Sequence, residues 1–343
     1  MTFDKTLDIL LVHCEGESGN VLIGGAPEIP GATILDKMNH LNVVDPSLRL
    51  FLTREPRAQV VHTTNLVLPP TRPDADAAFI VLQPDRAHPM SGSNCICVVT
   101  ALLETGRIAM VEPETIVRLD TAAGLIVARA RCENGHCLSV SLDNVPAFVH
   151  ALDVTIDTPK WGRIMGDIAF GGVFYAQIDV DRVGLRIVPE AARALAEAGT
   201  EIKALLADEV SPAHPEIPGF DEIAYVMFRD HQPDGSLLTC TTLKPGRVDR
   251  SPCGTGSSAH LAILHARGLA RTGDRRISHS IIGGTFTAEI LGEVTVGGRP
   301  AVLSRITGRG YVFGRQQLRL DPQDPFLQGF ALSDTWGLQV GDL

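Results

Sequence analysis

Two short stretches decide the fold, and the clearer of them is PCGTGSSA, residues 252–259, which opens a helical run that ends at Gly268. A distant stretch, MSGSNCIC at residues 90–97, opens a similar run that ends at Gly106. In each, a Ser or Cys precedes a Gly and then a hydroxyl residue, and a Gly lies fifteen positions on, since 106 − 91 = 15 and 268 − 253 = 15. The repetition predicts two similar domains facing one another across a cleft, each with a small-residue loop that leads into a helix.

The length of the chain agrees with two domains. Its 343 residues exceed the ~250–300 residues at which a single hydrophobic core stops growing. We expect an N-terminal domain over residues 1–155 and a C-terminal domain over residues 156–320, with the polar stretch DVTIDTPKWG at residues 153–162 as the linker. Whether residues 320–343 pack back onto the first domain stays open.

Charge and cysteine content narrow the class of protein. Acidic residues outnumber basic ones by 40 to 30, which gives a net charge of −10. Nucleic acids and anionic membranes attract clustered Lys and Arg, so we expect neither as a partner. Seven cysteines in a chain of this length are too few for a disulfide framework, and their number is odd, whereas such frameworks usually have an even number. No apolar stretch approaches the ~18 residues that cross a bilayer, and the N-terminus lacks a signal-peptide pattern. We expect a cytoplasmic protein with reduced thiols and a small-molecule partner.

Local patterns predict mostly strands with few helices. Ala, Leu and Glu after Pro189 predict a helix over residues 189–207. Residues 115–132 predict two strands around a turn at 122–124. Other apolar runs bounded by Gly, Pro or Asp predict strands at 7–13, 59–68, 78–82, 224–228 and 237–242 and in a tail over 286–320.

The residue types in the two loops suit acid–base chemistry on a small anion. Helix N-termini leave backbone N–H groups unpaired and partly positive, and small residues let a carboxylate approach those donors. The same field lowers the pKa of a thiol, so we expect Cys253 to act as a base near neutral pH. Ser91 holds the matching place in the first loop, and its alkoxide is far harder to form. We therefore expect Ser91 to donate a proton or a hydrogen bond.

Simpler roles and other chemistries compete with this interpretation. A small hydroxyl residue at a helix start is most often an N-cap, and a Cys is more often a buried small hydrophobe than a catalyst, but the repetition in both halves favours function. A thiol hydrolase using Cys253 stays open, because its His could come from anywhere. Cys132 and Cys137 flank His136 without a second pair at zinc-site spacing, so we expect no metal site. No GxxxxGK[ST] motif is present for nucleotide phosphates.

The second loop resembles a known signature. Residues 249–256, DRSPCGTG, are similar to the second catalytic signature of the proline racemase family, and MSGSN at 90–94 aligns with the first, which is usually Met-Cys-Gly-His. The resemblance covers nearly the whole chain. Further segments that fit are HCEGE at 13–17, GGAP at 24–27, EPR at 55–57, DIAFGG at 167–172 and DPQDPF at 321–326.

The resemblance implies a fold and a set of binding roles. The family fold is similar to that of diaminopimelate epimerase: two α/β domains whose strands wrap a central helix, with a cofactor-independent active site in the cleft between them. It implies that N–H groups near Gly92 and Ser93, and near Gly254 and Thr255, hold the substrate carboxylate. It implies that Asp249 contacts the ring ammonium of a cyclic imino acid.

One departure from the family pattern bears on the reaction. Racemases and 4-hydroxyproline 2-epimerases of this family carry Cys where this chain has Ser91. A hydroxyl is a poor partner for reversible two-base exchange, because the ideal catalytic pKa lies near the working pH. Family members that lost one thiol are associated with dehydration of trans-3-hydroxy-L-proline. We therefore expect a lyase that converts this substrate to Δ1-pyrroline-2-carboxylate, with Ser91 and Cys253 as its catalytic residues.

Two alternatives remain beside the dehydratase. Some Ser/Cys members of the family are thought to retain epimerase activity, so a 4-hydroxyproline 2-epimerase is the first alternative. A catalytically inactive protein that binds cyclic amino acids is the second, more distant one. Ser93 replaces the usual His of the first signature, which changes that half of the carboxylate site. The family is often dimeric, so a homodimer is possible.

Overall fold

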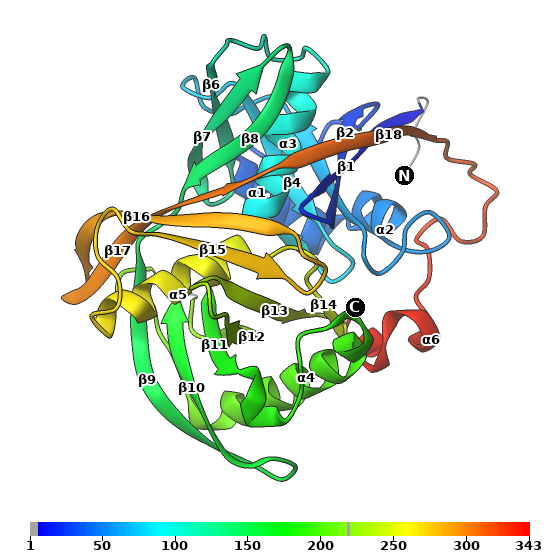
Figure 1. Cartoon of the computed structure of the whole chain (residues 1–343). Coiled ribbons are helices and arrows are strands. Elements are labelled where there is room, and N and C mark those ends of the chain that lie inside the picture. The colour runs from blue at the N-terminus through cyan, green and yellow to red at the C-terminus, as the bar shows by residue number, and fades with distance from the viewer. Residues whose placement is uncertain (1–5, 218–219) are drawn as a thin grey trace. The chain divides into compact units, whose positions relative to one another are not determined.

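The computed structural model describes residues 6–217 and 220–343 of the chain. The described residues form two compact units (Figure 1). Unit 1 combines the residues up to Leu142 with Gly308–Leu343, and unit 2 is Asp143–Thr307. Each unit contains one of the two loop–helix stretches.

Unit 1 is an arc of paired strands. Hydrogen-bonded neighbours follow the order β18-β1-β2-β3-β4-β6-β7-β8, with parallel pairing at β2–β3 and β4–β6 and antiparallel pairing elsewhere. The strands are β1 (Leu7–Cys14), β2 (Glu17–Gly24), β3 (Thr63–Leu68), β4 (Ala77–Leu82), β5 (Ala87–His88), β6 (Glu114–Thr121), β7 (Gly124–Glu133), β8 (His136–Asp143) and β18 (Gly310–Leu318). The helices are α1 (Ile34–Asn39), α2 (Ser47–Thr53), α3 (Gly92–Glu104) and α6 (Ser333–Trp336), with single turns at His40–Val44 and Leu338–Asp342.

Helix α3 is the central element of unit 1. Every residue from Asn94 to Leu103 is buried, and the helix packs against β1, β2, β3, β7 and β18 (Figure 1). A helix that is apolar on all sides needs such a surround of strands. It ends where Gly106 adopts a φ of +67°, a conformation that glycine reaches without strain.

Unit 2 is a closed ring of strands. The pairings run β9-β10-β11-β12-β13-β15-β16-β17 and return from β17 to β9, so each of these strands has a neighbour on both sides. The strands are β9 (Ala147–Thr158), β10 (Gly162–Phe170), β11 (Phe174–Asp179), β12 (Ile223–His231), β13 (Leu237–Leu243), β14 (Arg247–Val248), β15 (Arg275–Ser280), β16 (Thr285–Val296) and β17 (Arg299–Gly308). The helices are α4 (Ala192–Glu209) and α5 (Gly254–Ala266), with short turns at Val180–Val183 and Pro189–Ala191.

Helix α5 has the same place in unit 2 that α3 has in unit 1. It packs against β9, β10, β11 and β16, and most of its residues from Gly254 to Ile263 are buried (Figure 1). Helix α4 packs against β9, β12, β13 and β14, where Leu195, Ile202 and Leu206 join the larger apolar core of the unit. Within each unit, strands therefore surround one central helix, as the resemblance implies.

The predicted helices and strands are confirmed, except that the strand expected from residue 59 begins at Thr63, and the predicted linker is wrong. Residues 153–162 form the arms and turn of the β9–β10 hairpin, in which Ile156 pairs with Ile164 and both side chains are buried. The polar residues of this stretch alternate with apolar ones because one face of the hairpin is exposed. The units divide after Leu142 rather than at residue 155, and the chain returns to unit 1 at Gly308 rather than at residue 320, because β18 pairs along the whole of β1.

Candidate catalytic loops

Ser91, in the first loop, is the N-cap residue of α3, but its side chain does not cap the helix. Its backbone is extended (φ −152°, ψ 133°), and its carbonyl accepts the first helical bond from Cys95 N at 2.9 Å. The hydroxyl makes no capping hydrogen bond. A plain N-cap role, the simplest alternative from the sequence, therefore does not describe this side chain. The N–H groups of Gly92 and Ser93 belong to the first turn, where no helical carbonyl can reach them.

Polar contacts hold the Ser91 hydroxyl, and open space lies beside Gly92. Asn94 Nδ2 donates to Ser91 Oγ at 2.9 Å, and Ser93 Oγ lies 3.4 Å from the same oxygen. A Cβ built on Gly92 would meet no atom within 4 Å. An anion can therefore approach the first-turn N–H groups from this side.

The second loop is shaped by a short run of side-chain hydrogen bonds. Asp249 Oδ1 accepts from Ser251 N at 2.8 Å, and Ser251 Oγ accepts from Cys253 N at 3.2 Å. Asp249 is buried, with 8% of its surface exposed. Its carboxylate thus fixes the turn that carries Cys253, a role that the sequence does not indicate.

Cys253 itself has an unusual backbone. Its φ of +66° and ψ of 98° are rare for a residue with a Cβ, and such conformations cost of order 1–3 kcal/mol. It is the N-cap of α5 but makes no side-chain capping bond, and its carbonyl accepts from Ser257 N at 2.8 Å. The thiol lies beside the first turn of α5, since a Cβ at Gly256 would be 3.1 Å from Cys253 Sγ, and the N–H groups of Gly254 and Thr255 belong to the same turn.

Tyr175 on β11 is the neighbour that sequence reasoning missed. Its hydroxyl lies 3.2 Å from Cys253 Sγ and 2.7 Å from Thr255 Oγ1, and its ring is fully buried. Gly256 allows this arrangement, because a Cβ there would lie 2.7 Å from Met227 Sδ and 3.1 Å from Cys253 Sγ. Tyr175 lies three residues after the end of the DIAFGG segment, which resembles the family pattern but does not indicate a partner for the thiol.

The expected low pKa of Cys253 is wrong for the free protein. Burial, and then the nearby charge of Asp249, raise the pKa of the Cys253 thiol to about 11, while hydrogen bonds from Tyr175 and from Gly256 N–H act to lower it. Burial also raises the pKa of Tyr175 well above its ordinary value, so its hydroxyl stays neutral and able to donate. Desolvation outweighs the helix N-terminus here, and the thiol is protonated near neutral pH.

Comparison with known proteins identifies the family. Residues 9–331 match the family model described as proline racemase. A 4-hydroxyproline 2-epimerase 1 from Rhizobium rhizogenes strain K84 is 55% identical over 346 aligned positions, which cover 100% of both chains. The chain belongs to the proline racemase family.

Solved structures agree with this membership and with the fold. A hydroxyproline epimerase from Agrobacterium vitis with bound trans-4-hydroxy-L-proline superposes with a TM-score of 0.92 at 54% identity, covering 99% of this chain and 100% of that one. A predicted epimerase from Pseudomonas aeruginosa is only 14% identical, has a TM-score of 0.58, covers 92% of this chain and 100% of its own, and shares the fold. The mixed α/β epimerase fold predicted from the sequence is confirmed, and the chain is an enzyme of the proline racemase family.

The structure groups the predicted site residues of this racemase-family enzyme by unit. Ser91, Gly92 and Ser93 gather at the start of α3 in unit 1. The C-terminal members gather between β14 and the first turn of α5 in unit 2; they are Asp249, Cys253, Gly254 and Thr255.

The described residues also bear on the metal and membrane expectations from the sequence. Cys132 and Cys137 face each other as buried free thiols on β7 and β8, and no set of three or more His, Cys, Asp and Glu side chains in residues 6–217 and 220–343 could hold a metal ion. No helix in the same described residues is long and apolar enough to span a membrane.

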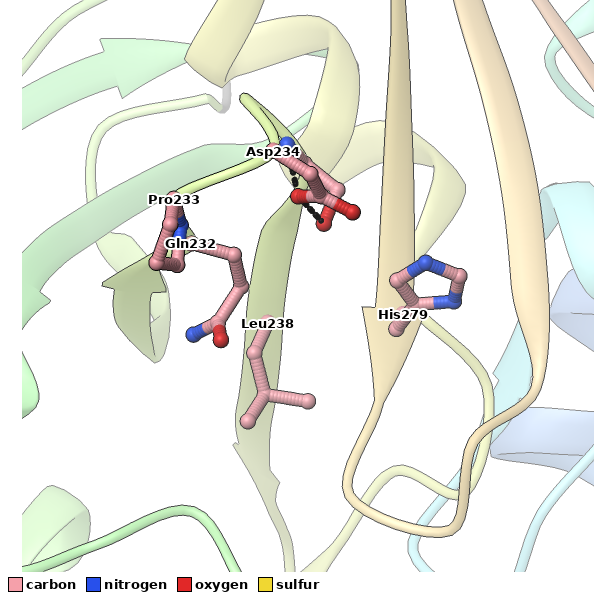
Figure 2. Close-up of a pocket in the computed structure, with 6 residues that line it drawn as sticks. Gln232, Pro233, Asp234, Leu238 and His279 are labelled. Atoms are coloured by element: carbon pink, nitrogen blue, oxygen red, sulfur yellow. Dashed lines mark hydrogen bonds between the residues drawn. The ribbon is translucent and has the colours of Figure 1, made fainter.

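A hollow of about 430 Å³ lies in unit 2 but away from Cys253. Figure 2 shows the side chains of Asp234, Leu238 and His279 around it. Leu238 and Thr239 point to opposite faces of β13, and Thr239 Oγ1 donates to Pro252 O at 3.0 Å on the face that carries the second loop. The hollow therefore belongs to the other face of the strand.

Proposed function

We propose that this member of the proline racemase family is a 4-hydroxyproline 2-epimerase. The observation that carries the proposal is the full-length 55% identity to a protein of that name, supported by the related structure named for bound trans-4-hydroxy-L-proline. The trans-3-hydroxy-L-proline dehydratase expected from the Ser91 substitution has no such support. A serine in place of one thiol weakens one acid–base partner, but it leaves a hydroxyl able to deliver a proton.

In the proposed reaction the two loops act on opposite faces of one substrate. First-turn N–H groups of α3 and α5 bind the carboxylate, which also accepts negative charge as the α-proton leaves. The Cys253 thiolate forms a bond to the α-proton, and the electron pair of the broken C–H bond moves into the carboxylate. The Ser91 hydroxyl then gives its proton to the other face of C2, and the electron pair returns to form the new C–H bond. The ring and its 4-hydroxyl are unchanged, and no step requires a cofactor.

Asp249 connects substrate binding to the protonation of Cys253. In the free protein its negative charge contributes to the raised pKa of the thiol. A ring ammonium bound beside Asp249 would offset that charge and add a positive one, and both effects favour the thiolate. The base would therefore form in the substrate complex, where it is used.

A substrate panel in D2O tests the proposal. Purified protein is incubated with trans-4-hydroxy-L-proline and, separately, with trans-3-hydroxy-L-proline, and products are followed by NMR and by trapping of cyclic imines with o-aminobenzaldehyde. We expect inversion at C2 of the 4-hydroxy substrate, with deuterium at C2 of the product, and no imine from the 3-hydroxy substrate. Imine without inversion would restore the dehydratase.

Variants at the two catalytic positions complete the test. Cys253→Ser and Ser91→Ala should each lower turnover by ~10³-fold or more, because each removes one of two proton-transfer groups. A protein that binds hydroxyproline without turnover, and keeps that affinity in Cys253→Ser, would instead be the inactive binding protein. A covalent acyl adduct on Cys253, seen by mass spectrometry, would indicate a thiol hydrolase.

A further inference from the structure

Two buried carboxamides lie beneath the Ser91 hydroxyl. Asn94, in the first turn of α3, is 3% exposed, and Asn65, on β3, is 0% exposed. The residues of α3 from Asn94 to Leu103 are all buried. Burial of an amide costs free energy unless its hydrogen bonds are made, so two such groups side by side need a reason.

The hydrogen bonds of these carboxamides fix the direction of donation. Asn65 Nδ2 donates to Asn94 Oδ1 at 2.9 Å and to the backbone carbonyl of Asn20 at 3.2 Å. A carboxamide has one accepting oxygen and one donating nitrogen. Because Asn94 Oδ1 receives a hydrogen bond from Asn65, its Nδ2 is the atom that faces Ser91 Oγ, at 2.9 Å.

The packing around Asn94 holds the amide in this place. A Cβ at Gly19 on β2 would lie 2.9 Å from Asn94 Oδ1 and 2.8 Å from Cys97 Sγ, so β2 has a glycine where the amide meets the strand. Asn65 Oδ1 is left buried without a hydrogen-bond partner. The pair thus leaves one buried oxygen unsatisfied while Asn65 Nδ2 holds Asn94 Oδ1 and Asn94 Nδ2 is directed toward Ser91, the opposite of what a purely structural arrangement would favour.

We propose that Asn94, oriented by Asn65, is a positioning residue for proton delivery by Ser91; the inference rests on the proposed epimerase function. A donor at Ser91 Oγ occupies one of its lone pairs, so the hydroxyl cannot donate to Asn94 Nδ2 and keeps its proton for another acceptor. When Ser91 has given that proton to C2, the alkoxide keeps the hydrogen bond from Asn94, now charge-assisted and stronger. The amide therefore compensates in part for the high pKa of a hydroxyl.

The substitution Asn94→Asp reverses the polarity of this contact with little change of shape. Its carboxylate can still accept from Asn65, but toward Ser91 it can only accept, so it draws the hydroxyl proton back and repels the alkoxide. We expect C2 inversion to fall by ~100-fold or more while KM changes less than threefold. Asn94→Ala, which removes the donor without adding charge, should lower inversion by ~10–100-fold, as expected for loss of one charge-assisted bond.

Isotope exchange separates positioning from general damage to the fold. In D2O, the enantiomer whose α-proton faces Cys253 can lose it to the thiolate and regain deuterium on the same face. We expect the ratio of this exchange to inversion to rise at least tenfold in both Asn94 variants and to stay at the wild-type value in Cys95→Ala, a buried residue of the same helix outside the pair. A ratio that does not rise in either Asn94 variant would overturn the inference. Absence of inversion in the wild-type protein would instead refute the proposed function.

Discussion

Removal of the Tyr175 hydroxyl is the perturbation that the structure defines most closely. Tyr175→Phe keeps the buried ring but removes the oxygen that lies 3.2 Å from Cys253 Sγ and 2.7 Å from Thr255 Oγ1. The contact lowers the pKa of Cys253, so its loss must raise that pKa above about 11. A hydrogen bond to a charged group contributes about 1.5–3 kcal/mol, and 1.36 kcal/mol corresponds to one pKa unit. The thiolate should become about 10–100 times rarer at any pH below the pKa.

The assay is the rate of C2 inversion between pH 6 and 9, with KM and kcat determined separately. We expect kcat/KM of Tyr175→Phe to be about 10–100 times lower than that of the wild type, by the same factor at each pH, since both proteins stay below the thiol pKa throughout. Tyr311→Phe, the same chemical change at a half-exposed tyrosine of β18, should leave the rate unchanged. Wild-type activity in Tyr175→Phe, or a ratio that changes with pH over this range, would refute the role given to the hydroxyl.

Three further results are expected in unit 2. Asp249→Asn keeps an acceptor for Ser251 N but removes a charge that raises the pKa of the Cys253 thiol, so iodoacetamide should alkylate Cys253 of the free protein faster at pH 8. The KM of this variant should rise about 10–100-fold, because the substrate ammonium loses its charged partner. An unchanged KM would show that Asp249 is not part of the binding site. Gly256→Ala places a Cβ 2.7 Å from Met227 Sδ and 3.1 Å from Cys253 Sγ, so the rate of C2 inversion should fall by ~100-fold. Alanine at Gly268 would have space but would be strained by the positive φ there. The matched control is therefore Ser257→Ala, which should change the rate little. Folding raises the pKa of Cys253, so the protonated thiol contributes its full stability below the unfolded pKa of ~8.5, and this contribution is lost as the pH rises toward about 11. The free energy of unfolding of the wild type should therefore decline relative to that of Cys253→Ser by about 1.4 kcal/mol per pH unit above ~8.5. Parallel pH curves for the two proteins would contradict the raised pKa.

The two loop–helix units could be predicted because their signals are local. A small-residue loop, an apolar run of one helical length and a closing glycine all lie within about 18 residues of sequence, near Ser91 and near Cys253. The hairpin at residues 153–162 has the polar residues and the proline, Pro159, that are typical of a linker. Only its partner strand shows that alternate residues such as Ile156 are buried.

The sequence does not reveal the long-range contacts that surround the candidate catalytic residues. Tyr175 reaches Cys253 across 78 positions of the chain, and Asn65 reaches Asn94 across 29. The sequence shows the helix start, which favours a low pKa of Cys253, but it does not show the burial that raises this pKa. The sequence likewise does not show that the Asn94 amide donates a hydrogen bond to the Ser91 hydroxyl.

The central proposal is that Cys253 removes the proton from C2 of 4-hydroxyproline and that Ser91 supplies a proton to the opposite face of C2. The most direct measurement is the NMR spectrum of trans-4-hydroxy-L-proline incubated with the purified protein in D2O. The account predicts cis-4-hydroxy-D-proline that carries one deuterium at C2, with formation abolished in both Cys253→Ser and Ser91→Ala. Unchanged 4-hydroxyproline, together with imine formed from trans-3-hydroxy-L-proline, would contradict it.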